Sequence, residues 1–88
     1  MIFYVYILIN QNHRIYIGQT NCIEMRLERH NSGLVKSTAP YRPWTILFTE
    51  QYQTRSEAII REKWLKTGIG REYIKKRLSS SIGPPAAD

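Results

Sequence analysis

Apolar and polar positions follow two successive patterns at the start of the chain. Residues 2–9 are an unbroken β-prone run, which is typical of a central strand covered on both faces. A polar turn cluster follows at 10–13, and apolar and polar residues then alternate over 14–19. We expect these two segments to form a β-hairpin.

The pattern changes to helical spacing after the hairpin. Asn21 is a predicted helix N-cap, and Glu24 stands three residues later in the capping-box position. Apolar residues then recur at helical intervals, and Gly33 is a natural stop. The spacing predicts a helix over about 22–32.

Prolines interrupt the next segment. Residues 34–43 form a basic loop in which Pro40 and Pro43 prevent regular structure. Strand character returns over 44–52. Alternation predicts four large residues on one side of this strand: Trp44, Ile46, Phe48 and Tyr52.

Two helices are expected in the last third of the chain. Thr54 and Glu57 form a second capping box, which predicts a helix over about 55–67. Gly68 and Gly70 break this pattern, and a short basic helix follows over about 70–78.

These elements predict the α+β class, with the order β-β-α-β-α-α. A three-stranded antiparallel sheet flanked by helices is the simplest arrangement of them. We expect one domain over residues 1–78 and a flexible C-terminal tail over 79–88, because 88 residues suffice for a single core.

Charge adds a class of partner to this picture. The chain carries 13 Lys and Arg against seven Asp and Glu, a net charge of +6. Eight of these basic residues lie in 55–77 beside only three glutamates. Such an excess favours a polyanionic partner such as nucleic acid, and a solubilising surface charge is the alternative.

Cysteine usage and hydropathy suggest a cellular setting. A single cysteine, Cys22, excludes an internal disulfide and suits a reducing cytoplasm. No apolar run approaches the roughly 20 residues that span a bilayer, so we expect no membrane association.

Several chemistries lack the residues they need. The only aspartate is Asp88, which argues against an acidic cluster holding two metal ions and against a Ser-His-Asp triad. One cysteine and two histidines cannot build a structural zinc site, and no glycine-rich phosphate loop follows a strand.

A single glutamate and one arginine–histidine pair remain as polar candidates. Glu62 shares a predicted helix face with Ala58 and Leu65, as either a boundary residue paired with an Arg or a metal ligand. Arg26 and His30 lie four residues apart, hence side by side on the first helix. An Arg can fork two hydrogen bonds onto a phosphate, and a neutral His can accept a proton. A surface Arg and a structural His are the alternative.

Strand tyrosines form the third candidate element. Tyr6 and Tyr16 are ordinary packing residues unless something else engages them. Gly18 removes a side chain from the face of Tyr16, which leaves room for a ligand or another backbone. The two tyrosines share a face if Tyr6 pairs directly with Tyr16, which requires an odd-length loop or a bulge.

These residues together resemble the GIY-YIG nuclease superfamily, most closely its small stand-alone bacterial members. Tyr4-Val5-Tyr6 and, ten residues later, Tyr16-Ile17-Gly18 look like the family signature, with Tyr4 in place of its first glycine. The resemblance covers roughly residues 2–78. Five residues then have the order and spacing of the family's active-site positions: Tyr6, Tyr16, Arg26, His30 and Glu62.

The resemblance implies metal-dependent hydrolysis of DNA phosphodiester bonds, as in the family's homing, restriction and repair endonucleases. Glu62 would bind a single Mg²⁺ or Mn²⁺ ion, and Arg26 would stabilise charge on the phosphorane. Tyr16, or His30 acting with it, would help to deprotonate water, and Tyr6 would orient water or phosphate. The general base stays open among these three. The expected substrate is branched or damaged DNA rather than a specific sequence, and RNA stays an open alternative.

The expected binding surface is basic, weak in sequence preference and sensitive to salt. Six residues are predicted to contact phosphates: Lys36, Arg42, Lys63, Lys66, Lys75 and Lys76. Three aromatic residues, Trp44, Trp64 and Tyr73, would either stack on bases or pack in the core. Two alternatives to a nuclease remain: a nucleic-acid-binding module that is catalytically weak or inactive, and an interaction domain that uses Ile60 and Trp64 for a protein partner or a second copy.

Overall fold

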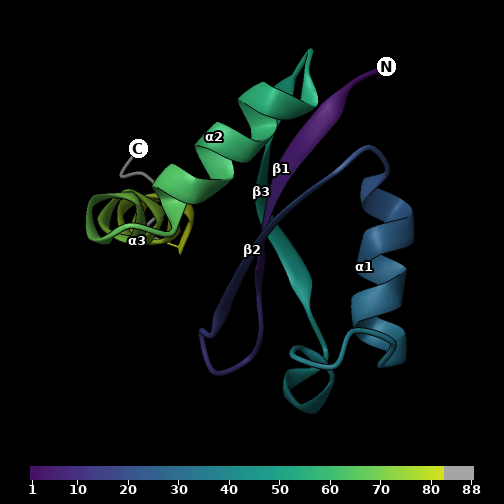
Figure 1. The fold of residues 1–88 in the computed structure, drawn as a ribbon. Helices are drawn as coiled ribbons and strands as arrows, with labels where there is room; N and C mark the ends of the chain where they lie inside the picture. The colour runs from purple at the N-terminus through teal and green to yellow at the C-terminus, as the bar shows by residue number, and fades with distance from the viewer. Residues whose placement is uncertain (83–88) are drawn as a thin grey trace.

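The computed structural model describes residues 1–82, and residues 83–88 lie outside the described part. The elements are β1 (Phe3–Ile9), β2 (Ile15–Thr20), α1 (Ile23–Ser32), the 3₁₀ helix η1 (Ala39–Tyr41), β3 (Thr45–Tyr52), α2 (Arg55–Leu65) and α3 (Gly68–Ile82). The strands form one antiparallel sheet in the order β2-β1-β3 (Figure 1). The predicted α+β class and element order are confirmed.

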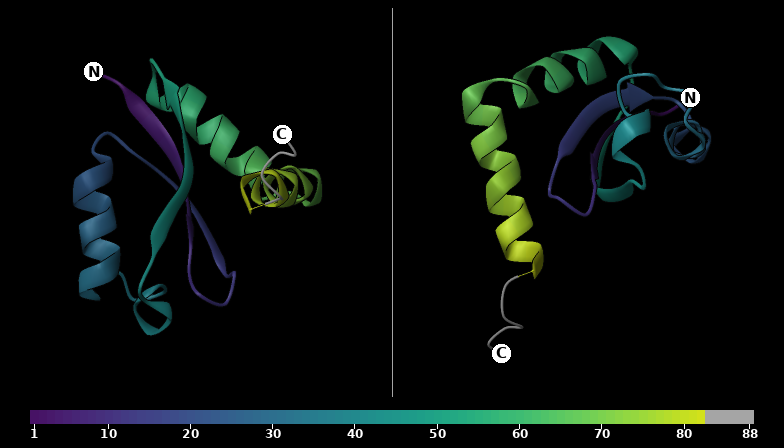
Figure 2. Two further views of the ribbon diagram at one scale, coloured as in Figure 1. Left: turned by 180° about the vertical axis from the view of Figure 1, so that it is seen from behind. Right: turned by 90° about the horizontal axis from the view of Figure 1, so that it is seen from below.

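The sheet lies between α1 on one side and α2 with α3 on the other, as Figures 1 and 2 show. One face packs against α2 and α3 through seven buried residues: Val5, Ile7, Ile17, Phe48, Ala58, Leu65 and Ile74. The other face packs against α1 and η1 through Tyr6, Leu8 and Trp44. Both faces of β1 are therefore covered, which explains its unbroken apolar run. Among the described residues, no helix combines the length and the apolar character needed to cross a bilayer.

The hairpin between β1 and β2 has a different register from the predicted one. Tyr6 pairs with Gly18, and Leu8 pairs with Tyr16, so the predicted pair of Tyr6 with Tyr16 is wrong by two residues. A shift of two keeps side chains on the same face, and the two tyrosines still share it. The register follows from a five-residue loop over 10–14, in which the Asn10 carboxamide oxygen accepts the N–H groups of Asn12 and Arg14.

A bulge in β3 changes which of its residues face α1. Ile7 pairs with Phe48, but the next residue, Leu8, pairs with Ile46, so one residue of β3 is extra. Trp44 therefore lies in the cluster under α1, whereas Phe48 lies in the cluster under α2. The prediction that both share one side is wrong because simple alternation does not continue through a bulge.

The ends of α1 agree only in part with the prediction. Its N-cap is Cys22 and not Asn21, and no side chain caps it. Thr20 instead accepts the Cys22 N–H with its hydroxyl oxygen, which organises the turn before the helix. At the other end Gly33 has φ of 87°, a left-handed conformation that glycine adopts without strain, so the predicted stop is confirmed.

The last two helices meet in a tight corner. The Thr54–Glu57 capping box of α2 is confirmed. α3 begins at Gly68, two residues earlier than predicted, because the Thr67 hydroxyl accepts the Gly70 N–H and starts the helix. α3 then continues to Ile82, so it enters the segment predicted as a tail, the rest of which lies outside the described residues.

Gly18 makes room for a tyrosine rather than for a ligand or a backbone. A Cβ atom added at Gly18 would stand 2.6 Å from the Tyr6 hydroxyl oxygen and 2.7 Å from its ring carbon Cζ. The Tyr6 ring thus crosses directly over its cross-strand partner. The Tyr6 hydroxyl can reach α1 only because position 18 has no side chain.

We therefore expect Gly18→Ala to push Tyr6 out of its place and to lower the free energy of unfolding by about 1–3 kcal/mol. Gly68→Ala is the matched control, because nothing lies within 4 Å of a Cβ added there. It should change stability by no more than about 1 kcal/mol. Urea unfolding of the two variants checks this, and equal effects would contradict the assignment.

Candidate active site

Tyr6, Tyr16 and His30 meet on the α1 side of the sheet. Tyr6 comes from β1, Tyr16 from β2 and His30 from α1. The Tyr6 hydroxyl lies 3.1 Å from His30 Nε2, in hydrogen-bonding contact. The Tyr16 ring centre lies 4.6 Å from that of His30 and 6.1 Å from that of Tyr6. Three separate elements thus bring polar side chains to one place.

The members of this cluster differ in exposure. Tyr6 is 1% exposed and His30 is fully buried, whereas Tyr16 is only half-buried. A buried imidazole needs partners for both nitrogens, and the second contact of His30 is Nδ1 to Thr38 Oγ1 at 2.8 Å. Burial, with Arg26 and Arg29 nearby, lowers the pKa of His30 below its ordinary value. His30 is therefore neutral at neutral pH.

Arg26 places a positive charge beside the two tyrosines. Hydrogen bonding to the Tyr6 hydroxyl raises the pKa of the Arg26 guanidinium against the effect of burial. Burial also raises the pKa of Tyr6, and Arg26 opposes that rise. Arg26 Nε is buried without a hydrogen-bond partner in the described part of the chain. The Arg26 residue as a whole is half-buried, and its charge is suited to an anionic ligand such as phosphate.

Two side-chain contacts set the rotation of α2 over the sheet. Arg55 donates to the Gln19 side chain of β2, with Nη1 and Oε1 3.1 Å apart. Arg61 donates to both carboxylate oxygens of Glu50 on β3, at 2.9 and 3.0 Å. One flank of α2 therefore faces the β2 edge of the sheet, and the other faces the β3 edge.

Glu62 lies on the flank of α2 that faces β2. It follows Arg55 by seven residues, which is close to two helical turns, so the two side chains share a flank. The Glu62 side chain is 20% exposed, and its Oε2 lies 2.8 Å from Lys66 Nζ. The sequence alternatives for Glu62 were an ion pair with an Arg or a metal ligand. Its partner in the structure is a lysine one turn away.

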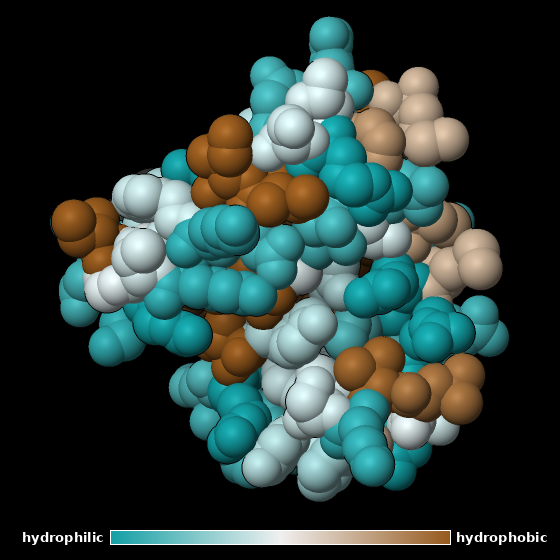
Figure 3. All heavy atoms as spheres, in the orientation of Figure 1, coloured by the Kyte–Doolittle hydropathy of each residue, from teal (hydrophilic) through white to brown (hydrophobic). Residues whose placement is uncertain are grey.

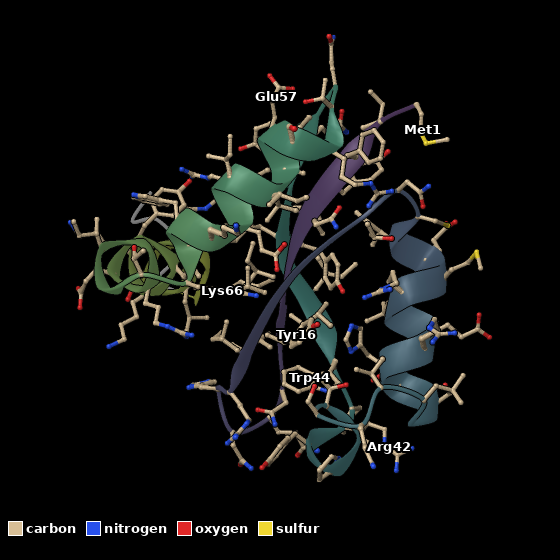
Figure 4. All side chains as sticks on the ribbon, viewed as in Figure 1. Met1, Tyr16, Arg42, Trp44, Glu57 and Lys66 are labelled. Carbon is tan, nitrogen blue, oxygen red and sulfur yellow. The ribbon has the colours of Figure 1, made fainter. Side chains whose placement is uncertain are left out.

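The structure therefore brings together four of the five predicted residues and sets the fifth apart. In the described part of the chain, Glu62 makes no hydrogen bond or ion pair with the cluster of Tyr6, Tyr16, Arg26 and His30. Because α2 covers the opposite face of the sheet, the edge strand β2 separates the two halves. Figure 4 shows Tyr16 on one side of β2 and Lys66, beside α2, on the other.

The donor set limits the kind of metal ion that could bind. Among the described residues, no group of three or more His, Cys, Asp or Glu gathers in one place. A single partly exposed carboxylate fits a hard ion such as Mg²⁺ or Mn²⁺ that keeps water and phosphate oxygens as its other ligands. Glu62 fits this requirement as one protein ligand, and it does not fit a complete protein cage.

The six predicted phosphate contacts divide between the two sides of the molecule. All six side chains are exposed. Lys36 and Arg42 belong to the segment around η1, on the side of the tyrosine cluster. Lys63 lies in α2, Lys66 is the C-cap residue of α2, and Lys75 and Lys76 lie in α3. One of those four, Lys66, is engaged with Glu62.

The aromatic residues that could have stacked on bases pack against other parts of the protein instead. Trp44 is 3% exposed and therefore cannot stack on a base. Trp64 meets Tyr73 of α3 edge to face, with centres 5.9 Å apart, and the Arg61 guanidinium covers the Trp64 ring at 4.6 Å. Packing of Trp64, one of the two predicted alternatives, agrees with these contacts.

The Ile60 side chain is 69% exposed and borders a hollow that Tyr52 and Trp64 also line. On the face drawn in Figure 3, hydrophobic side chains form small patches separated by hydrophilic ones. Binding of a partner or a second copy through Ile60 and Trp64 stays a prediction.

Two residues near the cluster were missed at the sequence level. Arg29, one turn after Arg26, lines with it a surface hollow of about 280 Å³ at the start of α1. Its helical spacing from Arg26 could have indicated it. Thr38 lies in the irregular loop before η1, where no periodicity predicts the direction of a side chain.

The sheet order and the tyrosine, arginine and histidine cluster define a nuclease-like domain of the GIY-YIG type. The sequence profile of the GIY-YIG catalytic domain matches residues 2–79. The chain therefore belongs to the GIY-YIG family, as its resemblance to that family predicted, and nucleic acid is the general substrate class of this domain.

Relatives of this chain carry the name UPF0213. A UPF0213 protein of Staphylococcus haemolyticus is 34% identical over 73 residues, which are 82% of this chain and 89% of that protein. One from Staphylococcus saprophyticus is 37% identical with the same coverage. The solution NMR structure of a UPF0213 protein from Bacillus halodurans is similar with a TM-score of 0.51 and 30% identity, covering 97% of this chain and 89% of that one.

The lowered pKa of His30 makes stability depend on pH. The unfolded chain binds a proton at His30 near pH 6.5, where the folded protein does not. We expect the free energy of unfolding to be constant above about pH 6.5 and to fall as the pH drops toward about 5. Urea unfolding across this range measures the slope.

His13, which is exposed in the hairpin loop, supplies the matched control. His13→Gln should keep the decline, whereas His30→Gln should remove most of it. A decline of the same size in both variants would show that another group is responsible.

Proposed function

We propose that this chain hydrolyses phosphodiester bonds of DNA at the cluster formed by Tyr6, Tyr16, Arg26 and His30. The observation that supports this most strongly is the convergence of four side chains from β1, β2 and α1 in a GIY-YIG domain. Phosphodiester hydrolysis requires positioning and charge stabilisation more than covalent help, and this cluster can supply both.

Arg26 and Tyr16 are the groups that would face the substrate. Arg26 stays charged and is half-buried, so it would stabilise the charge that builds on the phosphorane. Tyr16 is half-buried, and its hydroxyl would orient or deprotonate the attacking water. Of the candidate bases, Tyr16 is the least enclosed.

Tyr6 and His30 would not contact the substrate directly but would position Arg26 and Tyr16 from the protein interior. Both are buried, and among residues 1–82 the hydrogen-bonding contact of His30 Nε2 is with the Tyr6 hydroxyl. A neutral imidazole in this place can hold the Tyr6 proton or accept it. The contact with His30 would thereby fix the direction of the Tyr6 O–H bond. The lone pairs of the Tyr6 oxygen would then face Arg26 and the substrate.

Glu62 would hold the single divalent ion. When bound, Mg²⁺ or Mn²⁺ would neutralise charge on a phosphate oxygen and ease departure of the 3′ oxygen. The ion pair with Lys66 does not prevent this, because exposed pairs four residues apart on a helix contribute only about 0.3–0.5 kcal/mol. Once released from Glu62, Lys66 would be free to contact a phosphate at the β2 edge.

A second function is supported by a specific observation. Lys66 already neutralises Glu62, and the edge strand separates this carboxylate from the cluster. A domain arranged in this way can bind nucleic acid through its basic groups without useful turnover. The alternative is therefore a nucleic-acid-binding module.

Incubation of the pure chain with labelled branched, nicked and single-stranded DNA in Mg²⁺ or Mn²⁺ tests the first function. We expect cleavage that Arg26→Gln or Glu62→Gln lowers by about 10²–10³-fold, because each removes charge stabilisation from the transition state.

Glu72→Gln, a change of an exposed carboxylate on α3, should leave cleavage unaltered. Undiminished cleavage by Glu62→Gln would indicate a contaminating nuclease. Binding by the wild type without cleavage on any of these substrates would support the binding module.

Phosphate contacts predict a characteristic response to salt. Binding of a short DNA should weaken steeply as salt rises, with little dependence on sequence. The double change Lys36→Gln with Arg42→Gln should lower the slope of log Kd against log salt by about 2, since each phosphate contact contributes about 1. Both side chains lie on the side of the cluster.

The double change Lys75→Gln with Lys76→Gln removes the same charge from α3. Fluorescence anisotropy at several salt concentrations compares the two variants. A smaller loss of slope in the α3 variant would assign binding to the cluster side, and an affinity independent of salt would contradict phosphate contacts altogether.

A further inference from the structure

We propose that Thr38 is a positioning residue of this site, whose hydroxyl oxygen holds His30 in the tautomer that has hydrogen on Nδ1 and a lone pair on Nε2. The consequence for catalysis rests on the proposed function, but the tautomer itself is a property of the folded chain. Thr38 is 2% exposed and contacts an imidazole that is fully buried.

The contact between Tyr6 and His30 gives the first argument for this tautomer. The buried Tyr6 hydroxyl has a proton that needs an acceptor. The Arg26 guanidinium beside it can only donate. The Tyr16 hydroxyl beside it is a second possible acceptor. The contact with His30 Nε2, at 3.1 Å, has good hydrogen-bond geometry, so we assign the Tyr6 proton to it, and Nε2 then has no hydrogen. A neutral imidazole then carries its hydrogen on Nδ1.

The Thr38 end leads to the same assignment. Thr38 Oγ1 lies 2.8 Å from His30 Nδ1 and 3.3 Å from the Val35 carbonyl oxygen. A carbonyl oxygen can only accept, so the hydroxyl can donate to Val35 only when it accepts from Nδ1. In the opposite tautomer the hydroxyl proton would turn to Nδ1 and the contact with Val35 would be lost as a hydrogen bond, although the Val35 carbonyl oxygen would keep the N–H groups of Thr38 and Ala39, at 3.1 and 2.9 Å. The chosen tautomer makes every contact a hydrogen bond.

The surrounding loop holds Thr38 in place. The indole N–H of Trp44 donates to the Thr38 carbonyl oxygen at 3.0 Å. Asn31 of α1 in turn binds the backbone of Trp44 twice, accepting its N–H at 2.7 Å and donating to its carbonyl oxygen at 3.0 Å. Thr38 is thus tied to α1 and to the start of β3, and its hydroxyl cannot easily move away from His30.

This assignment decides what Tyr6 can do. With Nε2 as acceptor, the Tyr6 proton points at His30, and the oxygen lone pairs point toward Arg26 and away from the imidazole. If Tyr6 accepts a proton from the site, it can pass its own proton to Nε2, which gives an imidazolium. In the other tautomer His30 would donate to Tyr6 and could not take that proton.

The test is ¹⁵N NMR of the imidazole rings in the full chain at about pH 8, where histidine is neutral. Protonated and deprotonated ring nitrogens have well-separated shifts, and His13 in the same spectrum is the internal reference. We expect hydrogen on Nδ1 of His30 in the wild type and in Thr38→Ser, which keeps the hydroxyl.

Thr38→Val has nearly the same shape but no acceptor. We expect it to populate the Nε2–H form beside the Nδ1–H form, because Nδ1–H then has no acceptor while Tyr6 still favours a free Nε2. We also expect it to lower the pKa of His30 further, because the imidazolium loses a partner for Nδ1–H. Hydrogen on Nε2 in the wild type would overturn the proposal, as would an unchanged tautomer and pKa in a folded Thr38→Val. The wild-type spectrum decides the tautomer even if Thr38→Val does not fold.

Activity provides a separate readout. If the wild type cleaves DNA, Thr38→Val should lower kcat by about 10–100-fold with little change in KM, as removal of outer partners of functional imidazoles does. Thr38→Ser should restore it. Absence of cleavage by the wild type would refute the proposed function and leave the tautomer result standing, whereas full activity of Thr38→Val would overturn the positioning role.

Discussion

The contact between the Tyr6 hydroxyl and His30 Nε2 is the constraint on which the rest of this site depends. It joins the central strand to α1 through two polar side chains that are almost completely buried. Buried polar groups must be satisfied, so the contact requires Gly18 to leave space on the sheet and Thr38 to supply the second partner of the imidazole. A strand, a helix and a loop therefore all help to fix the position of the Tyr6 hydroxyl oxygen.

The burial of His30 in this contact also determines which groups of the site are charged. The enclosed imidazole stays neutral because it is buried and because Arg26 and Arg29 lie nearby. The positive charge of the site then belongs to the arginines, and part of the Arg26 guanidinium has no protein partner among the described residues. A low-dielectric surround strengthens the attraction of this charge for an anion. A phosphate diester at the β2 edge would meet Arg26 from one face of the sheet and Glu62 with Lys66 from the other.

Much of the fold could be predicted because its signals are local. The Thr54–Glu57 capping box, the left-handed stop at Gly33 and the apolar run of β1 each depend on a few neighbouring residues. The errors arose where one side chain organises backbone at a distance from its own position. The Asn10 carboxamide sets a five-residue loop and hence the hairpin register, and a bulge in β3 moves Trp44 to the face opposite Phe48.

For the site, the sequence by itself determined which side chains are available and which of them are neighbours. Arg26 and His30 share a helix surface because the period of 3.6 residues acts within a single element. Tyr6 and Tyr16 lie on paired strands, and they share a face because their register is offset by an even number of residues. Only the tertiary structure decided that Gly18 accommodates Tyr6, that Thr38 holds His30, and that Glu62 lies across an edge strand with Lys66 as its partner. These relations depend on how separate elements pack, and no short-range period along the chain encodes that packing.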